Sequence, residues 1–153
     1  MESQKRYRKS YALQPSVGGG AYTSGDAIGT LQTLSGAFRV DQAGRVLECT
    51  VIDVDNQKAD LDILLFQSNT LASGVNNAPF APAEAELKEI VGVVSVTAAD
   101  YVDVGTSAFA QVDIELDLQL EASQNLFAQI VSRGTPTYSD TDNLEVRLIV
   151  LQD

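Results

Sequence analysis

Hydrophobic and polar residues alternate along much of this chain, in short runs that turn-forming residues separate. In DIELDLQLE at 113–121, isoleucine and leucines share one face, while acidic and amide side chains occupy the other. A period of two is typical of a strand with one buried and one solvated face. RVLECTVIDVD at 45–55 is rich in β-branched residues and places Leu47, Cys49 and Val51 on one face. Both segments are therefore predicted strands.

Further strands follow from shorter segments. DLDILLF at 60–66 and IVGVVSV at 90–96 are almost wholly apolar, which is typical of strands buried on both faces. TAADYVDVG at 97–105 indicates a turn followed by a small strand. The remaining predicted strands are LQTLSGAFRV, NLFAQIVSR and LEVRLIVLQ. Turn-rich stretches separate about seven or eight strands, a pattern that favours an all-β fold.

One segment has a helical pattern instead. PAEAELKEI, from Pro82 to Ile90, starts with proline at an acceptable first-turn position and carries two early glutamates. Leu87 lies at helical spacing from Ile90 and Val91. We expect one short helix between strands. Short strands with almost no helix predict an antiparallel β-sandwich, and eight strands suit a jelly-roll, although the pattern does not give the strand order.

Charge divides the chain into two parts. The formal net charge is −11, but residues 1–11 hold four basic residues against one acidic one, a net +3. The remaining residues carry −14. Because three consecutive glycines in SVGGGAY are typical of a joint, we expect residues 1–20 to form a flexible basic arm and residues 21–153 to form the sandwich domain. Because such an acidic domain repels phosphate groups, nucleic acid is not the expected partner.

Composition removes several kinds of chemistry. Histidine is absent, which excludes Ser-His-Asp and Cys-His catalysis and every zinc site that needs imidazole. The lone cysteine, Cys49, excludes an internal disulfide and falls in an apolar alternation, so we expect a small core residue. No apolar run reaches the ~18 residues of a membrane span, and no secretory signal pattern follows the basic start. We expect synthesis in the cytoplasm without membrane insertion.

The best metal candidate is the acidic stretch DVDNQKADLD, from Asp53 to Asp62. Calcium prefers several oxygen ligands close together. The stretch lacks calcium-loop spacing, because Gln57 occupies the third ligand position, Lys58 replaces the required glycine, and no glutamate closes the loop. We therefore favour two strands whose aspartates face solvent across a turn, while a cation site stays open.

Two further groups of residues are candidates for function. Asp113, Glu115 and Asp117 share a face at a spacing that a glycosidase could use, but a charged strand face is usually only solvated surface. Arg133 and Tyr138 lie in the loop SRGTPTYSDTD and are residue types common in interfaces, although they could equally pack the loop. SVGGGAY lacks the spacing of a phosphate-binding loop. No catalytic residue or cofactor is expected.

Several blocks of the chain resemble a known group of proteins. They are AYTSGDAIGTLQTL, RVLECTVIDVDNQKADLDILLFQSN, APFAPAEAELKEIVGVVSVTAADYVDVG and LFAQIVSRGTPTYSDTDNLEVRLIVLQD. In this order they are similar to structural proteins of tailed-bacteriophage heads, some of which resemble capsid cement, or decoration, proteins. The resemblance covers residues 21–153 and leaves out the basic arm.

The resemblance implies a jelly-roll-like virion protein on the outer capsid surface, assembled in the bacterial host cytoplasm. Its implied partners are the major capsid protein and further copies of itself, as a homotrimer across the joints between capsid subunits. A sugar-binding β-sandwich module, a tail or baseplate subunit and a small hydrolase are the alternatives. Candidate residues for contact with the capsid or a sister subunit are Lys5, Arg6, Tyr7, Arg8, Lys9, Tyr11, Phe80, Arg133 and Tyr138.

Overall fold

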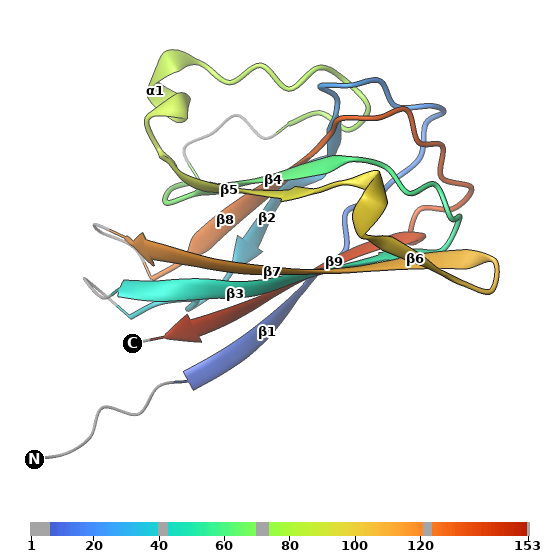
Figure 1. The fold of residues 1–153 in the computed structure, drawn as a ribbon. Helices are drawn as coiled ribbons and strands as arrows, with labels where there is room; N and C mark the ends of the chain where they lie inside the picture. Colours follow the sequence, from blue (N-terminus) through green and yellow to red (C-terminus); the bar gives the residue numbers. More distant parts are fainter. Residues whose placement is uncertain (1–6, 40–42, 70–73, 121–123, 153) are drawn as a thin grey trace, which may run out of the picture.

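A computed structural model describes residues 7–39, 43–69, 74–120 and 124–152, which form two facing antiparallel sheets (Figure 1). The first sheet has the strand order β1-β9-β3-β7-β6, and the second has the order β2-β8-β4-β5. The strands are β1 (Tyr7–Leu13), β2 (Ala27–Leu34), β3 (Ala43–Asp53), β4 (Leu61–Phe66), β5 (Ile90–Val96), β6 (Tyr101–Val104), β7 (Ser107–Gln119), β8 (Leu126–Ser132) and β9 (Leu144–Gln152). The prediction of an all-β sandwich is confirmed.

The strand order is that of a jelly-roll. Apart from β6, eight strands form two four-stranded sheets, and the chain crosses between the sheets at most of its connections. The strand β6 is an addition at the edge of the first sheet, where it forms a hairpin with β7. Side chains of alternate residues fill the space between the sheets, among them Ile63 and Leu65 of β4 and Val146, Leu148 and Val150 of β9. Full burial of each such side chain contributes roughly 1.5–3 kcal/mol.

A bulge in β3 changes which side chains face the core. The register shifts between Val46 and Glu48 against both neighbouring strands, so that Leu47 is the extra residue against β9. As a result Val46, Cys49 and Val51 are buried, whereas Leu47 is only partly buried. The expectation for Cys49 and Val51 is confirmed, but Leu47 does not share their face.

The expected flexible arm is wrong for residues 7–20. Tyr7–Leu13 form β1, which pairs with β9 in continuous register from Tyr7 opposite Gln152 to Leu13 opposite Val146. The chain then passes close to β2. A Cβ added to Gly29 of β2 would lie only 2.6 Å from the Cβ of Pro15, so the two backbones approach each other closely there. Leu13 and Val17 are each only 2 % exposed. Residues 7–20 therefore belong to the sandwich, because their backbone pairing and buried side chains hold them there.

The three consecutive glycines are not a loose joint. Gly18, Gly19 and Gly20 have φ values of 127°, 86° and 98°, which side chains with a Cβ rarely adopt. The Gly18 amide donates to the Tyr22 hydroxyl, and the side-chain amides of Asn76 and Asn77 donate to the carbonyl oxygens of Gly18 and Gly19. Glycine is needed here for a specific backbone path that hydrogen bonds fix.

The long connection between β4 and β5 covers the outer face of the second sheet (Figure 1). It contains α1 (Glu84–Leu87), shorter than the predicted Pro82–Ile90 because β-branched Ile90–Val96 is already strand β5. This cover explains why β8 is buried along its whole length. A single 3₁₀ turn, Ala98–Asp100, precedes β6, which confirms the predicted turn and small strand. Among the described residues, no helix is long and apolar enough to cross a membrane.

Candidate functional site

The basic and aromatic residues of β1 lie at one edge of the first sheet. Tyr7 is 45 % exposed, and the Arg39 guanidinium lies 5.4 Å from the centre of its ring, a cation–π contact. The Arg8 guanidinium lies 3.9 Å from a Glu48 carboxylate oxygen, and the Arg8 side chain is 62 % exposed. We call Tyr7, Arg8, Lys9 and Arg39 the β1 edge. Two other candidates, Lys5 and Arg6, lie outside the described residues.

Two side chains of β1 fasten the strand to the neighbouring loop. The Tyr11 hydroxyl donates to the Ser35 carbonyl oxygen at 2.8 Å, and burial raises the pKa of Tyr11. The Lys9 ammonium donates to the Gly36 carbonyl oxygen at 3.3 Å. Lys9 is exposed and keeps its charge available to a partner, whereas Tyr11 is half-buried and serves mainly to hold the strand in place. The geometry thus presents a fixed basic strip instead of a mobile arm.

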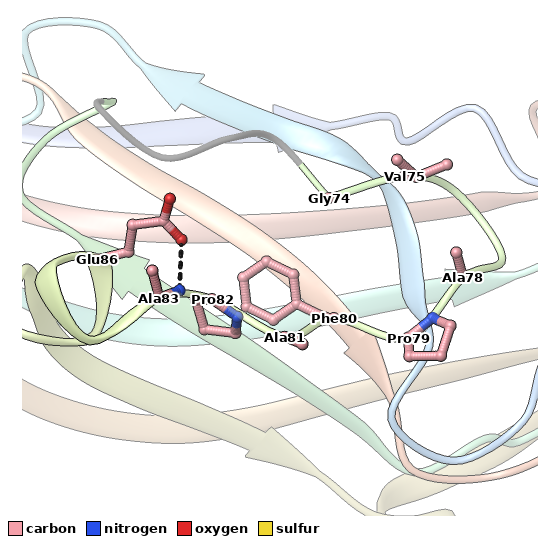
Figure 2. A pocket seen from close by; sticks show the side chains of 9 residues that line it. All are labelled: Gly74, Val75, Ala78, Pro79, Phe80, Ala81, Pro82, Ala83 and Glu86. Atoms are coloured by element: carbon pink, nitrogen blue, oxygen red, sulfur yellow. Dashed lines mark hydrogen bonds between the residues drawn. The ribbon is translucent and has the colours of Figure 1, made fainter.

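Phe80 lines a shallow hollow on the outer face of the second sheet (Figure 2). Its ring meets Phe66 edge-on, with ring centres 6.4 Å apart, so the side chain is half-buried. The hollow has a volume of about 290 Å³ and is walled mostly by alanine and proline side chains between Gly74 and Glu86. At its rim the Ala83 amide donates to Glu86 Oε2 at 2.9 Å. Phe80 therefore mainly covers the outer face of the sheet, and only part of its ring is accessible to a partner.

The loop residues Arg133 and Tyr138 have different environments. Tyr138 is 5 % exposed and meets Tyr22 edge-on at 6.0 Å, and burial raises its pKa. Tyr138 is thus a core residue in this chain, and its expected place on a contact surface is wrong. Arg133 is exposed, but its Nε donates to Asp62 at 2.7 Å. That ion pair ties the loop to β4.

The acidic stretch serves to fix loops. The Asp55 carboxylate accepts hydrogen bonds from Ser139 and Asn143, Asp60 accepts from the Ala98 amide at 2.6 Å, and Asp62 binds Arg133 and Ser95. These carboxylates hold the 132–142 loop and the start of the 3₁₀ turn against the start of β4. Within the described ranges, no three His, Cys, Asp or Glu residues gather in a way that could hold a metal ion.

Asp53 differs from its predicted place on the solvated face. Its side chain points inward, on the same face as Cys49 and Val51, and is 1 % exposed. One carboxylate oxygen accepts the Lys58 amide at 2.8 Å, while the other is buried without a hydrogen-bond partner. Desolvation raises the pKa of this carboxyl. Asp53 thus organises the tight loop that follows β3.

The carboxylates of β7 do not converge on a site. Asp117 binds Arg45 at 2.7 Å across the sheet, and both side chains are largely exposed. Glu115 has a φ of 52° and lies at the bulge, where the register against β3 shifts. This face has the character of a solvated strand surface, in line with the interpretation from the sequence.

A second surface was not among the candidates from the sequence. Five apolar residues, which we call the β6 patch, lie on the outer face of the first sheet around β6: Ile52, Val54, Val102, Val104 and Phe109. Val54, Val102 and Val104 are 45 %, 66 % and 60 % exposed. YVDV predicts a small strand, but only the pairing with β7 and β3 brings these side chains together.

The comparisons with known proteins show neither a family nor a function for this chain. No family model matches this chain, and no curated protein matches it. A solved structure of infectious bursal disease virus, Gx strain, is similar over 98 % of this chain, with 10 % sequence identity and a TM-score of 0.41. This chain corresponds to 33 % of that viral chain. The functional assignment therefore depends on this chain's own residues.

Proposed function

We propose that this protein is a structural subunit of a bacteriophage particle, and that it binds the outer capsid surface across the joints between major capsid subunits, as a trimer. The observation that carries the proposal is the β1 edge, a fixed basic and aromatic strip on a sandwich that is otherwise strongly acidic. Arginine and tyrosine are enriched in protein interfaces, and charge complementarity directs the encounter with an acidic partner. The resemblance to head proteins of tailed phages supports the same role.

The rest of the molecule suits such a role. The carboxylates that could have formed a metal or hydrolytic site hold loops together instead, so the described part of the sandwich is rigid at the end where Asp55, Asp60 and Asp62 lie. A rigid body that binds only the closed capsid lattice stabilises that lattice by mass action. Three copies joined together bind with a high effective concentration of each further contact. This role requires no catalytic residue and no cofactor.

The test is occupancy on purified capsids. Deletion of residues 1–20 is unsuitable, because it removes strand β1 and with it part of the fold. We instead replace Arg8 and Lys9 by glutamate, since both side chains are exposed. The expected result is a loss of at least tenfold in apparent affinity for capsids, which corresponds to about 1.4 kcal/mol.

A control variant tests whether negative charge added elsewhere on the surface has the same effect. Lys88→Glu adds negative charge at the end of α1, on a side chain that is 73 % exposed and that precedes β5 of the other sheet. We expect this variant to bind capsids as the wild type does. Equal binding by the wild type and by the variant with Arg8→Glu and Lys9→Glu would refute a role for the β1 edge.

A further inference from the structure

The β6 patch is an apolar surface formed by cross-strand neighbours. Val102, Phe109 and Ile52 are direct partners in register across β6, β7 and β3, so their side chains lie side by side on the outer face. The Ser107 hydroxyl donates to the Val54 carbonyl oxygen at 3.0 Å, which brings Val54 against the start of β7. Exposed apolar side chains grouped in this way mark an interaction surface more strongly than the same residues scattered singly.

The same strand is also an open edge. In the described part of the chain, β6 pairs with β7 on one side and with no strand on the other, and β1 likewise pairs only with β9. The two strands are the opposite edges of one sheet (Figure 1). Edge strands present unpaired backbone groups that can add a strand from another chain, unless charge or a bulge prevents it.

The two edges differ in charge. Arg8, Lys9 and Arg39 make the β1 edge positive, with Glu48 as the acidic neighbour. Around β6, the exposed aspartate Asp103 and the preceding Asp100 are acidic. Lys58 binds Asp103 at 2.6 Å. Together Lys58, Asp100 and Asp103 carry a net charge of −1. Opposite charges steer two such edges together, while two copies of either edge repel each other.

We propose that the β6 patch docks against the β1 edge of a second copy of this chain, which continues the five-stranded sheet from one copy into the next. Side chains alternate between the two faces along a strand, so the aliphatic part of Arg8 would lie beside the exposed valines on the outer face, and Lys9 would lie beside Asp103 on the opposite face. Because the two surfaces are different, the contact is head-to-tail and gives a ring when the rotation between copies closes. The inference rests on the proposed structural role and makes a second copy the direct partner of the β1 edge, so that Arg8 and Lys9 would support capsid binding through assembly of the trimer.

The first test is sedimentation of the purified protein without capsids over a range of micromolar concentrations. The expected result for the wild type is a closed oligomer. Val102→Lys with Val104→Lys on one variant, and Arg8→Glu with Lys9→Glu on another, should each sediment as monomers. All four side chains are exposed, so both variants should keep the wild-type urea midpoint for unfolding.

Mixing the two variants decides the geometry. Each keeps one intact surface, and the introduced lysines and glutamates are themselves complementary, so an equimolar mixture should associate again. Val93→Lys is the matched control, because Val93 is 47 % exposed on β5 in the other sheet, and it should leave the oligomer intact. A wild type that stays monomeric, oligomers in either variant, a mixture that does not associate, or dissociation by Val93→Lys would each overturn the inference.

The two proposals can fail separately. If the wild type is monomeric in solution but still binds capsids through the β1 edge, the head-to-tail contact is wrong and the proposed function stands. If the oligomer forms as expected but does not bind capsids, the contact between copies stands and the proposed function is wrong.

Discussion

Replacement of Leu13 by alanine tests whether β1 is part of the folded domain. Leu13 is 2 % exposed, lies opposite Val146 of β9 and belongs to the core cluster. A Leu→Ala change in a core lowers the free energy of unfolding by roughly 2–5 kcal/mol. The loss is smaller where the surrounding residues can move into the space left by the side chain. Because β1 is an edge strand with neighbours on one side only, we expect about 2–3 kcal/mol.

Urea unfolding gives the measurement. With a slope of roughly 1–3 kcal/mol per molar for small proteins, a loss of about 2–3 kcal/mol lowers the unfolding midpoint by about 0.7–3 M. Ser10→Ala on the exposed part of the same strand is the control and should change stability by less than about 0.5 kcal/mol. An unchanged midpoint for Leu13→Ala would refute the conclusion that residues 7–20 fold with the sandwich.

Two further predictions concern the backbone and a buried carboxyl. Gly29→Ala should destabilise the protein more than Gly105→Ala in urea unfolding: both have positive φ, but only at Gly29 would the new Cβ meet Pro15, at 2.6 Å. Equal losses would contradict this close approach. Burial raises the pKa of Asp53 above 3.8, so its contribution to stability is complete below that value and is lost as pH rises through the folded-state pKa. Asp53→Asn should remove this part of the pH dependence of the unfolding free energy, and an unchanged profile would contradict it.

The strands with clear alternation could be predicted from the sequence, because a strand with one buried and one solvated face requires apolar and polar residues to alternate. The alternating segment 144–152 coincides with β9, and the apolar run 90–96 coincides with β5. β1 was missed for a physical reason. Most side chains of an edge strand face solvent, so YRKSYAL has no apolar alternation, and its partner β9 lies far away along the chain. The backbone pairing that makes it a strand leaves no local signal.

The sites depended on features that the sequence does not encode locally. The residues around Tyr138 have the composition of a surface loop, yet the Tyr138 ring packs against Tyr22 in the core. Asp53 lies in an acidic, turn-rich stretch that is typical of a solvated surface, but the alternation through Cys49 and Val51 places its side chain on the buried face. The β6 patch exists only through the register of three strands. For Tyr138 and the β6 patch, the deciding contact joins residues that are distant in sequence.

The most direct test of the proposed role is a density map of intact phage particles in whose preparation this chain is detected. We predict jelly-roll density on the outer capsid surface, located over the joints between major capsid subunits, with the β1 edge of each copy against the β6 patch of the next. Particles that lack this density on the head, or that carry the chain only in the tail, would contradict it.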